Sequence, residues 1–112
     1  MYQIVKFVFP FTDDFKKGKP RPAVVISPSF GKHKQTILAF ITTDLKERLD
    51  TDIFIGDRLS YFSQTGLRSS SVLKLHRLIT TDPSQIGDVI GILPEQLIPQ
   101  VKKKLIKIFQ LQ

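Results

Sequence analysis

The sequence contains no cysteine and no tryptophan among its 112 residues. Without cysteine, disulfide bonds and thiolate metal sites are excluded, which is consistent with a reducing cytosol. No apolar run approaches the length of about 20 residues that a membrane-spanning helix needs. The first residues, Met1 to Lys6, lack the basic stretch and long apolar run of a secretory signal. We therefore expect a cytoplasmic protein with no membrane partner.

Acidic residues are scarce as well, since 10 Asp and Glu stand against 17 Lys and Arg and leave a formal net charge of +7. Such a balance favours polyanionic partners, either nucleic acid or an acidic protein. Charge alone does not decide the matter, because many basic proteins bind neither.

The motifs of the common catalytic classes are missing too. The sequence has no Gly-rich phosphate loop, no metal-ligand spacing and no Gly-x-Ser-x-Gly elbow. Asp13-Asp14 and Asp50-x-Asp52 could bind a divalent ion, but acidic residues in turns are more often solvated turn formers. We expect neither a metal nor another cofactor.

What the sequence does contain is a series of short apolar runs of strand length. They are Ile4–Phe11, Ala23–Ser27, Thr36–Ile41, Asp52–Ile55, Val72–His76 and Ile86–Leu93. From Pro94 onward, apolar residues at spacings of three and four predict a helix, which Pro99 should restart or kink. Asp44 and Glu47 have the form of a capping box for one helical turn. The sum predicts a mainly β, small antiparallel barrel with a C-terminal helix, in one domain over residues 1–112.

The most site-like stretch runs from Lys19 to Thr42. Pro20 and Pro22 stiffen the chain on both sides of Arg21. If the two strands that follow pair antiparallel, Arg21 at the start of one lies near Thr42 at the end of the other. The alternative is that Arg21 is a solvated loop charge and Thr42 an ordinary strand-end residue.

Further cations and hydroxyls lie on or beside a later strand. Strand alternation puts Lys74 and His76 on one face, and Ser69 and Ser70 lie in the turn before them. Together with Arg21 and Thr42, such groups suit the stabilisation of a phosphoryl oxyanion. His76 could equally be a strand-surface histidine.

Five segments in order carry a resemblance to a known family. They read VFPFTD (8–13), RPAVVIS (21–27), AFIT (39–42), GLRSSSVLKL (66–75) and IGIL (90–93) before the helix. Over nearly the whole chain the sequence resembles the MazF/PemK toxin family. The resemblance implies an SH3-like barrel of the MazF/PemK-CcdB type that forms a homodimer. It also implies the toxin of a type II toxin-antitoxin pair, with an acidic cognate antitoxin that covers the RNA site.

In that family the toxin cleaves single-stranded RNA without metal and so blocks translation, leaving 2′,3′-cyclic phosphate and 5′-hydroxyl ends. Arg21 matches the family's catalytic arginine, which would neutralise the phosphorane, and Thr42 its catalytic threonine, which would hydrogen-bond a non-bridging oxygen. A guanidinium stays protonated and makes a poor base, so His76 is the candidate for that role. Lys74 and His76 stand where some members carry arginine and aspartate, so both could instead only bind RNA.

Contacts to RNA phosphates are expected from a set of lysines and serines, namely Lys16, Lys17, Lys19, Ser69, Ser70 and Lys74. Two other functions compete with RNA cleavage. A non-catalytic barrel that binds RNA or an acidic protein is compatible with the basic charge. A topoisomerase poison is disfavoured, because the related toxins of that type act through a C-terminal tryptophan and this chain has none.

Overall fold

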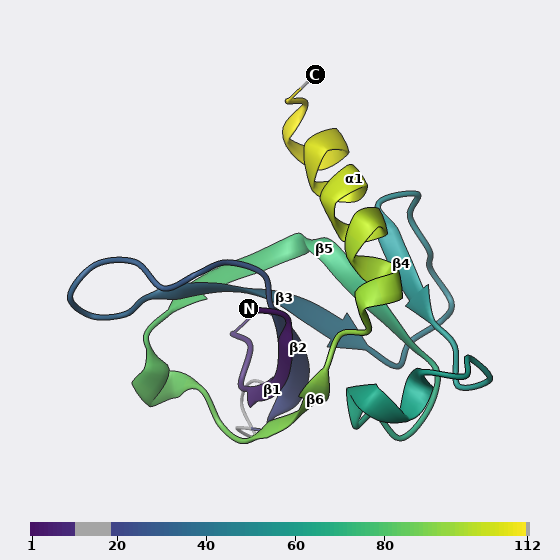
Figure 1. The fold of residues 1–112 in the computed structure, drawn as a ribbon, viewed down its shortest axis with the longest axis horizontal. Helices are drawn as coiled ribbons and strands as arrows, with labels where there is room; N and C mark the ends of the chain where they lie inside the picture. Colours follow the sequence, from purple (N-terminus) through teal and green to yellow (C-terminus); the bar gives the residue numbers. More distant parts are fainter. Residues whose placement is uncertain (11–18, 112) are drawn as a thin grey trace.

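The structure is a computed structural model that describes residues 1–10 and 19–111. Six strands form one antiparallel sheet that curls into a half-barrel (Figure 1), in the order β4-β5-β3-β2-β1-β6. The strands are β1 (Gln3–Phe7), β2 (Arg21–Val25), β3 (Thr36–Thr42), β4 (Asp52–Ile55), β5 (Ser71–Thr81) and β6 (Val89–Ile92). The helix α1 (Ile98–Phe109) follows. The predicted mainly β fold with a C-terminal helix is confirmed, but β1 ends at Phe7, before the predicted end, and β6 begins at Val89, three residues after the predicted start.

The sheet is buried on both faces, as the continuous apolar runs of the central strands predicted. One core lies on the side of α1 and contains Ile4, Val24, Ala39, Ile41, Ile53, Ile55, Leu73, Leu75, Leu93, Leu97 and Val101. The other contains Val5, Phe7, Phe9, Ala23, Leu38 and Phe40. In this second core the ring of Phe9 meets Phe7 and Phe40 edge to face, with centroids 4.9 Å apart in each pair.

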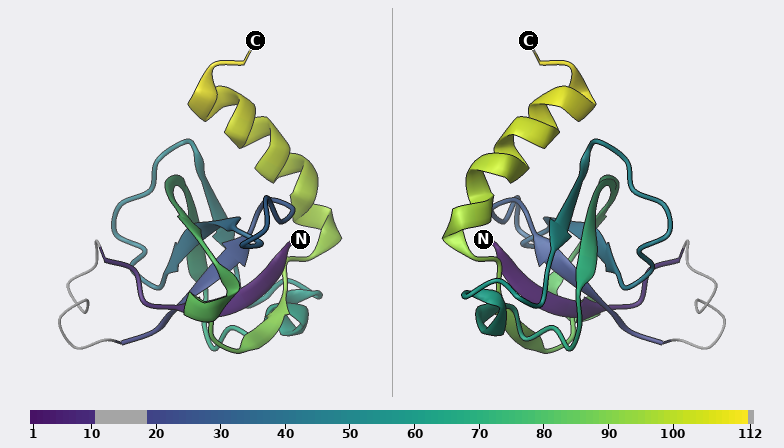
Figure 2. Two further views of the ribbon diagram at one scale, coloured as in Figure 1. Left: turned by 90° about the vertical axis from the view of Figure 1, so that its left-hand side faces the viewer. Right: turned by 90° about the vertical axis from the view of Figure 1, so that its right-hand side faces the viewer.

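The apolar face of the helix packs against the core along its length through Val101, Leu105 and Ile108, and its last turn extends beyond the sheet (Figure 2). A 3₁₀ turn, η4 (Glu95–Leu97), leads into α1, and Pro99 lies in the first turn of the new helix, so the predicted restart at this proline is confirmed. Val101 is fully buried, whereas Phe109 is 55% exposed near the end that stands clear of the sheet (Figure 2). No helix in the described ranges is long and apolar enough to cross a membrane.

Two glycines allow β6 to pass close to the 3₁₀ turn η2 (Phe62–Thr65). A Cβ on Gly91 would lie 2.3 Å from the backbone carbon and oxygen of Thr65. A Cβ on Gly66, whose φ is +70°, would lie 1.9 Å from the backbone oxygen of Ile90. The contact holds the segment after η2 beside the ends of β1 and β2.

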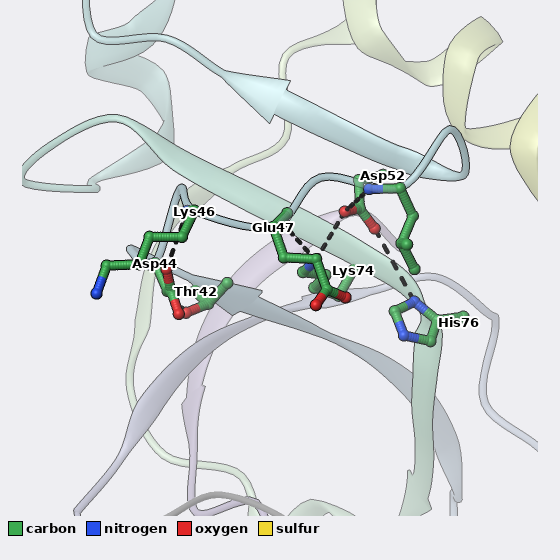
Figure 3. A network of polar contacts seen from close by, with 8 residues as sticks. Thr42, Asp44, Lys46, Glu47, Asp52, Lys74 and His76 are labelled. Atoms are coloured by element: carbon green, nitrogen blue, oxygen red, sulfur yellow. Dashed lines mark hydrogen bonds and ion pairs between the residues drawn. The ribbon is translucent and has the colours of Figure 1, made fainter.

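The helical turn predicted around Asp44 is wrong, because residues 43–51 form an irregular loop. The Thr42 hydroxyl accepts from the Asp44 amide at 3.1 Å, and the Asp44 carboxylate accepts from the Lys46 amide at 3.0 Å (Figure 3). Short polar side chains that bind nearby amides in this way compete with helix formation.

Candidate active site

Arg21 and Thr42 stand level at the same end of two neighbouring strands. β2 and β3 pair antiparallel with Ala23 opposite Phe40. Continued by two residues, this register sets Arg21 level with Thr42, and opposed residues of antiparallel strands have Cα atoms about 5 Å apart. Both residues are half-buried. The predicted proximity of the two backbone positions therefore follows from the strand pairing.

Their side chains, however, line two different pockets. A cavity of about 420 Å³, here called the cationic pocket, is lined by Lys6, Lys19, Pro20, Arg21, Pro22, Thr43, Gly66, Leu67, Arg68, Ser69, Ser71 and Ile90. Lys6, Lys19, Arg21 and Arg68 are basic, and none of the described residues that line this pocket is acidic. An anion fits this environment, since two of the four cations are forked guanidinium donors.

The second cavity, here called the Thr42 pocket, measures about 370 Å³ and is lined by Phe40, Thr42, Asp44, Glu47, Lys74, His76 and Arg77. Thr42 lines this pocket and Thr43 lines the cationic pocket. Thr42 and Thr43 are neighbours in the chain, so the two cavities meet at the end of β3. Opposed residues of antiparallel strands carry their side chains on the same face of the sheet, so Arg21 and Thr42 share a face. A chain molecule that crosses this strand end would meet cations on one side and a hydroxyl and an imidazole on the other.

Lys74 lines the Thr42 pocket, but its side chain is nearly fully buried and its ammonium group is bound by protein groups. Lys74 as a whole is 7% exposed. Its Nζ donates to Asp52 Oδ2 at 2.7 Å and to the Glu47 backbone oxygen at 3.1 Å (Figure 3). The Leu49 amide donates to the same Asp52 oxygen at 2.8 Å. These bonds fasten the loop 43–51 across the pocket. A direct contact of Lys74 with RNA stays a prediction.

His76 lies at the rim, with its side chain 39% exposed and its Nδ1 at 3.9 Å from Asp52 Oδ1. A bulge in β5 puts it there together with Arg77. Phe40 pairs with Lys74, but Ala39 pairs with Leu78, so β5 carries three extra residues, 75–77, at this point. Regular alternation would send His76 and Arg77 to opposite faces, yet both line the Thr42 pocket.

The remaining predicted residues divide between the pockets and their surroundings. Ser69 and Lys19 line the cationic pocket, whereas the Ser70 hydroxyl accepts from the Asp57 amide at 2.9 Å. Lys16 and Lys17 lie outside the described residues. The described residues contain no group of three or more His, Asp or Glu that could hold a metal ion.

Sequence reasoning missed three cations that the pockets contain. Lys6 comes from β1 and Arg68 from the segment after η2, and both line the cationic pocket. Arg77 lines the Thr42 pocket, with its guanidinium carbon 5.4 Å from the centre of the Phe40 ring. Arg68 lies inside the GLRSSS segment that carried the family resemblance, so a signal existed for it. Lys6 and Arg77 lie outside the segments that carried the resemblance, so the sequence offered no signal for them.

The fold and the paired pockets define a small β half-barrel protein with a cationic pocket at one end of its central strands. The family model for the "PemK-like, MazF-like toxin of type II toxin-antitoxin system" matches residues 2–109, so the chain belongs to this toxin family. In a sequence comparison, no curated protein matches the chain significantly.

Solved structures share the fold at low identity. The Mycobacterium tuberculosis toxin MazF-mt6 superposes with a TM-score of 0.73 at 19% identity, covering 98% of each chain. An endoribonuclease from a mycobacterial species, solved in complex with its cognate antitoxin, gives 0.70 at 12% identity, covering 99% of this chain and 94% of that one. A further M. tuberculosis toxin gives 0.68 at 17%, covering 96% and 100%. At such identities the likeness establishes the fold.

Proposed function

We propose that the chain is an endoribonuclease toxin that cuts single-stranded RNA, mRNA above all, and so blocks translation and growth. The observation that carries the proposal is the cationic pocket directly beside the Thr42 pocket, at the end of β2 and β3. RNA cleavage needs cations for the phosphate and a base for the 2′-hydroxyl, and the two pockets hold both kinds of group. Membership of the toxin family supports the same reaction.

In the proposed reaction the ribose 2′-oxygen attacks the adjacent phosphorus while its proton passes to the His76 imidazole. The bond from phosphorus to the 5′-oxygen breaks, and that oxygen takes up a proton from solvent. The products are a 2′,3′-cyclic phosphate and a free 5′-hydroxyl. Arg21 neutralises the phosphorane, because its fork matches the geometry of phosphate oxygens. Thr42 donates its hydroxyl to a non-bridging oxygen. No step requires a metal ion.

The strand on either side of the cut is proposed to follow the basic residues. Lys19, Arg68 and Ser69 would hold phosphates in the cationic pocket. Lys16 and Lys17 precede Lys19 in the sequence and are proposed to extend this contact, with Ser70 and Lys74 kept as further candidates. Binding of this kind weakens steeply with salt.

The proposed partners follow from charge and family. A net charge of +7 suits an acidic cognate antitoxin, and one structural neighbour was solved as an endoribonuclease with its cognate antitoxin. We further propose a cytoplasmic homodimer in which residues 1–112 form one domain. An antitoxin seated over the two pockets would compete with RNA.

The test is cleavage of a long, sequence-diverse single-stranded RNA in EDTA, with analysis of the fragment ends. Wild type should cut at a short fixed motif and leave cyclic phosphate and 5′-hydroxyl ends. Arg21→Ala should lose about 10²–10³-fold in rate, the usual effect of removing one oxyanion donor. Arg58→Ala is the matched control, because Arg58 is an exposed arginine that lines neither pocket.

Two results would count against the proposal. If the folded wild type leaves every RNA intact but binds it, and Arg21→Ala only weakens binding, the chain is a non-catalytic RNA-binding barrel. If Arg58→Ala loses as much cleavage as Arg21→Ala, the loss reflects general charge and the two pockets are not the active site.

A further inference from the structure

We propose that Asp52 is the positioning residue for His76. Its carboxylate holds the imidazole as the Nδ1–H tautomer and leaves Nε2 free to accept the proton of the 2′-hydroxyl. The inference rests on the proposed ribonuclease function, in which His76 is the general base. It explains how Asp52 keeps that imidazole ready to accept a proton. Asp52 lies on β4, outside every segment that carried the family resemblance.

The two oxygens of the Asp52 carboxylate have different surroundings. Oδ2 accepts two hydrogen bonds, one from the Lys74 ammonium at 2.7 Å and one from the Leu49 amide at 2.8 Å. Oδ1 is buried and has no hydrogen-bond partner among the described residues, in a side chain that is 1% exposed. A buried acceptor without a donor is destabilising and rare in native proteins, so such an atom calls for an explanation.

The group that Oδ1 faces is the His76 ring (Figure 3). Nδ1 lies 3.9 Å away, about 1 Å beyond the usual length of a nitrogen–oxygen hydrogen bond. Hydrogen bonds of catalytic groups are often long in free enzymes and shorten once substrate is bound. A half-exposed ring at the rim of the Thr42 pocket has room to close this gap, whereas Asp52 is held by two donors.

A carboxylate that faces Nδ1 selects the proton position on the ring. Only Nδ1–H can donate to Oδ1, and a neutral imidazole with that proton has its lone pair on Nε2. The same logic explains why an asparagine in place of the serine-protease aspartate leaves the histidine in the wrong tautomer. Asp52 would therefore act through His76 without touching RNA.

Charged groups from each neighbouring element complete the environment of His76. Lys74 and Arg77 come from β5, and Asp44 and Glu47 come from the loop 43–51. Lys74 supplies the positive charge that compensates the buried Asp52 carboxylate. Asp44 and Glu47 are exposed, and the Asp44 carboxylate already accepts from the Lys46 amide. Asp52 is thus the buried, oriented acid beside the ring.

The first measurement is the tautomer of His76 in the wild-type protein, from long-range ¹H–¹⁵N correlation spectra near pH 8. The chain has two histidines, so His33→Gln assigns the signals. We expect a protonated Nδ1 and an unprotonated Nε2. In Asp52→Asn the amide oxygen can keep the hydrogen bonds from the Lys74 ammonium and the Leu49 amide, which turns the NH₂ group toward His76. That group donates and needs an acceptor, so the His76 tautomer should change to Nε2–H.

The second measurement is cleavage by Asp52→Asn, checked for folding by circular dichroism. We expect a loss of at least about 10–100-fold, the size found when the groups that orient metal-bound histidines are removed. The loss should fall on kcat rather than KM, because Asp52 does not reach RNA. Asp88→Asn removes the same charge from an exposed residue directly before β6 and should leave both the tautomer and the rate unchanged.

An Nε2–H tautomer in the wild type overturns the inference even if the protein cleaves RNA, and so does a folded Asp52→Asn with full activity. A wild type that cleaves no RNA overturns the proposed function instead. In that case an observed Nδ1–H tautomer leaves Asp52 as a structural partner only.

Discussion

Replacing Lys74 with methionine removes one partner of a buried ion pair and keeps most of the side chain's volume. The side chains of Lys74 and Asp52 are 9% and 1% exposed, and their charged atoms are 2.7 Å apart. Without the ammonium, the Asp52 carboxylate keeps one donor, the Leu49 amide. An uncompensated buried charge of this kind lowers the free energy of unfolding by about 3–5 kcal/mol.

For a chain of 112 residues, an entropy of about 2.1 cal/mol/K per residue gives an unfolding entropy near 0.24 kcal/mol/K. The loss therefore corresponds to a fall in Tm of roughly 13–21 °C. Differential scanning calorimetry and urea unfolding followed by circular dichroism would measure it. The double variant Asp52→Asn/Lys74→Met should recover at least half of the loss, because it removes the buried charge as well.

Lys107→Met is the matched control, since it breaks an ion pair with Asp50 in which both side chains are largely exposed. Its effect on Tm should be much smaller, because solvent screens such pairs. The reasoning is refuted if Lys74→Met costs less than about 1 kcal/mol, or if the double variant is no more stable than the single one.

Two more predictions concern the packing of β6 and the contact between α1 and the loop 43–51. Gly91→Ala should lower stability by about 1–3 kcal/mol or more, because its Cβ would lie 2.3 Å from the Thr65 backbone; a wild-type urea midpoint would contradict this. The pKa of Asp50 lies below its ordinary 3.8, first through the hydrogen bond from Lys107 and then through that lysine's charge. The contact therefore stabilises the fold above that value and is lost as pH falls through the lowered pKa. In Lys107→Gln, NMR titration should show the Asp50 pKa rising toward 3.8, and an unchanged pKa would remove the basis for this contact.

Much of the fold could be predicted from local pattern. The apolar runs of the central strands predicted burial on both faces, and spacings of three and four predicted the helix. Arg21 and Thr42 could be paired in advance, because consecutive antiparallel strands place the start of one beside the end of the next. These predictions succeed because they depend on neighbours in sequence or on one hairpin.

Prediction failed where a side chain had two local options. Asp44 and Glu47 have the spacing of a capping box, yet the Thr42 hydroxyl and the Asp44 carboxylate bind amides of the next residues and form a turn. The sequence pattern is the same for both outcomes. The anchoring of this loop by Lys74, which binds the Glu47 backbone from 27 positions away, favours the irregular course.

The sequence by itself thus determined that the chain has six apolar strands, a C-terminal helix and a basic charge, since each follows from composition or periodicity. It also predicted that Arg21 and Thr42 lie level across one connection. Tertiary structure alone decided how the site is assembled. The bulge in β5 turns His76 and Arg77 into one pocket. The pairing of β4 with β5 sets Asp52 opposite Lys74. Such relations depend on register between distant strands, and the free energy that fixes register is spread over the whole core rather than encoded in any one segment.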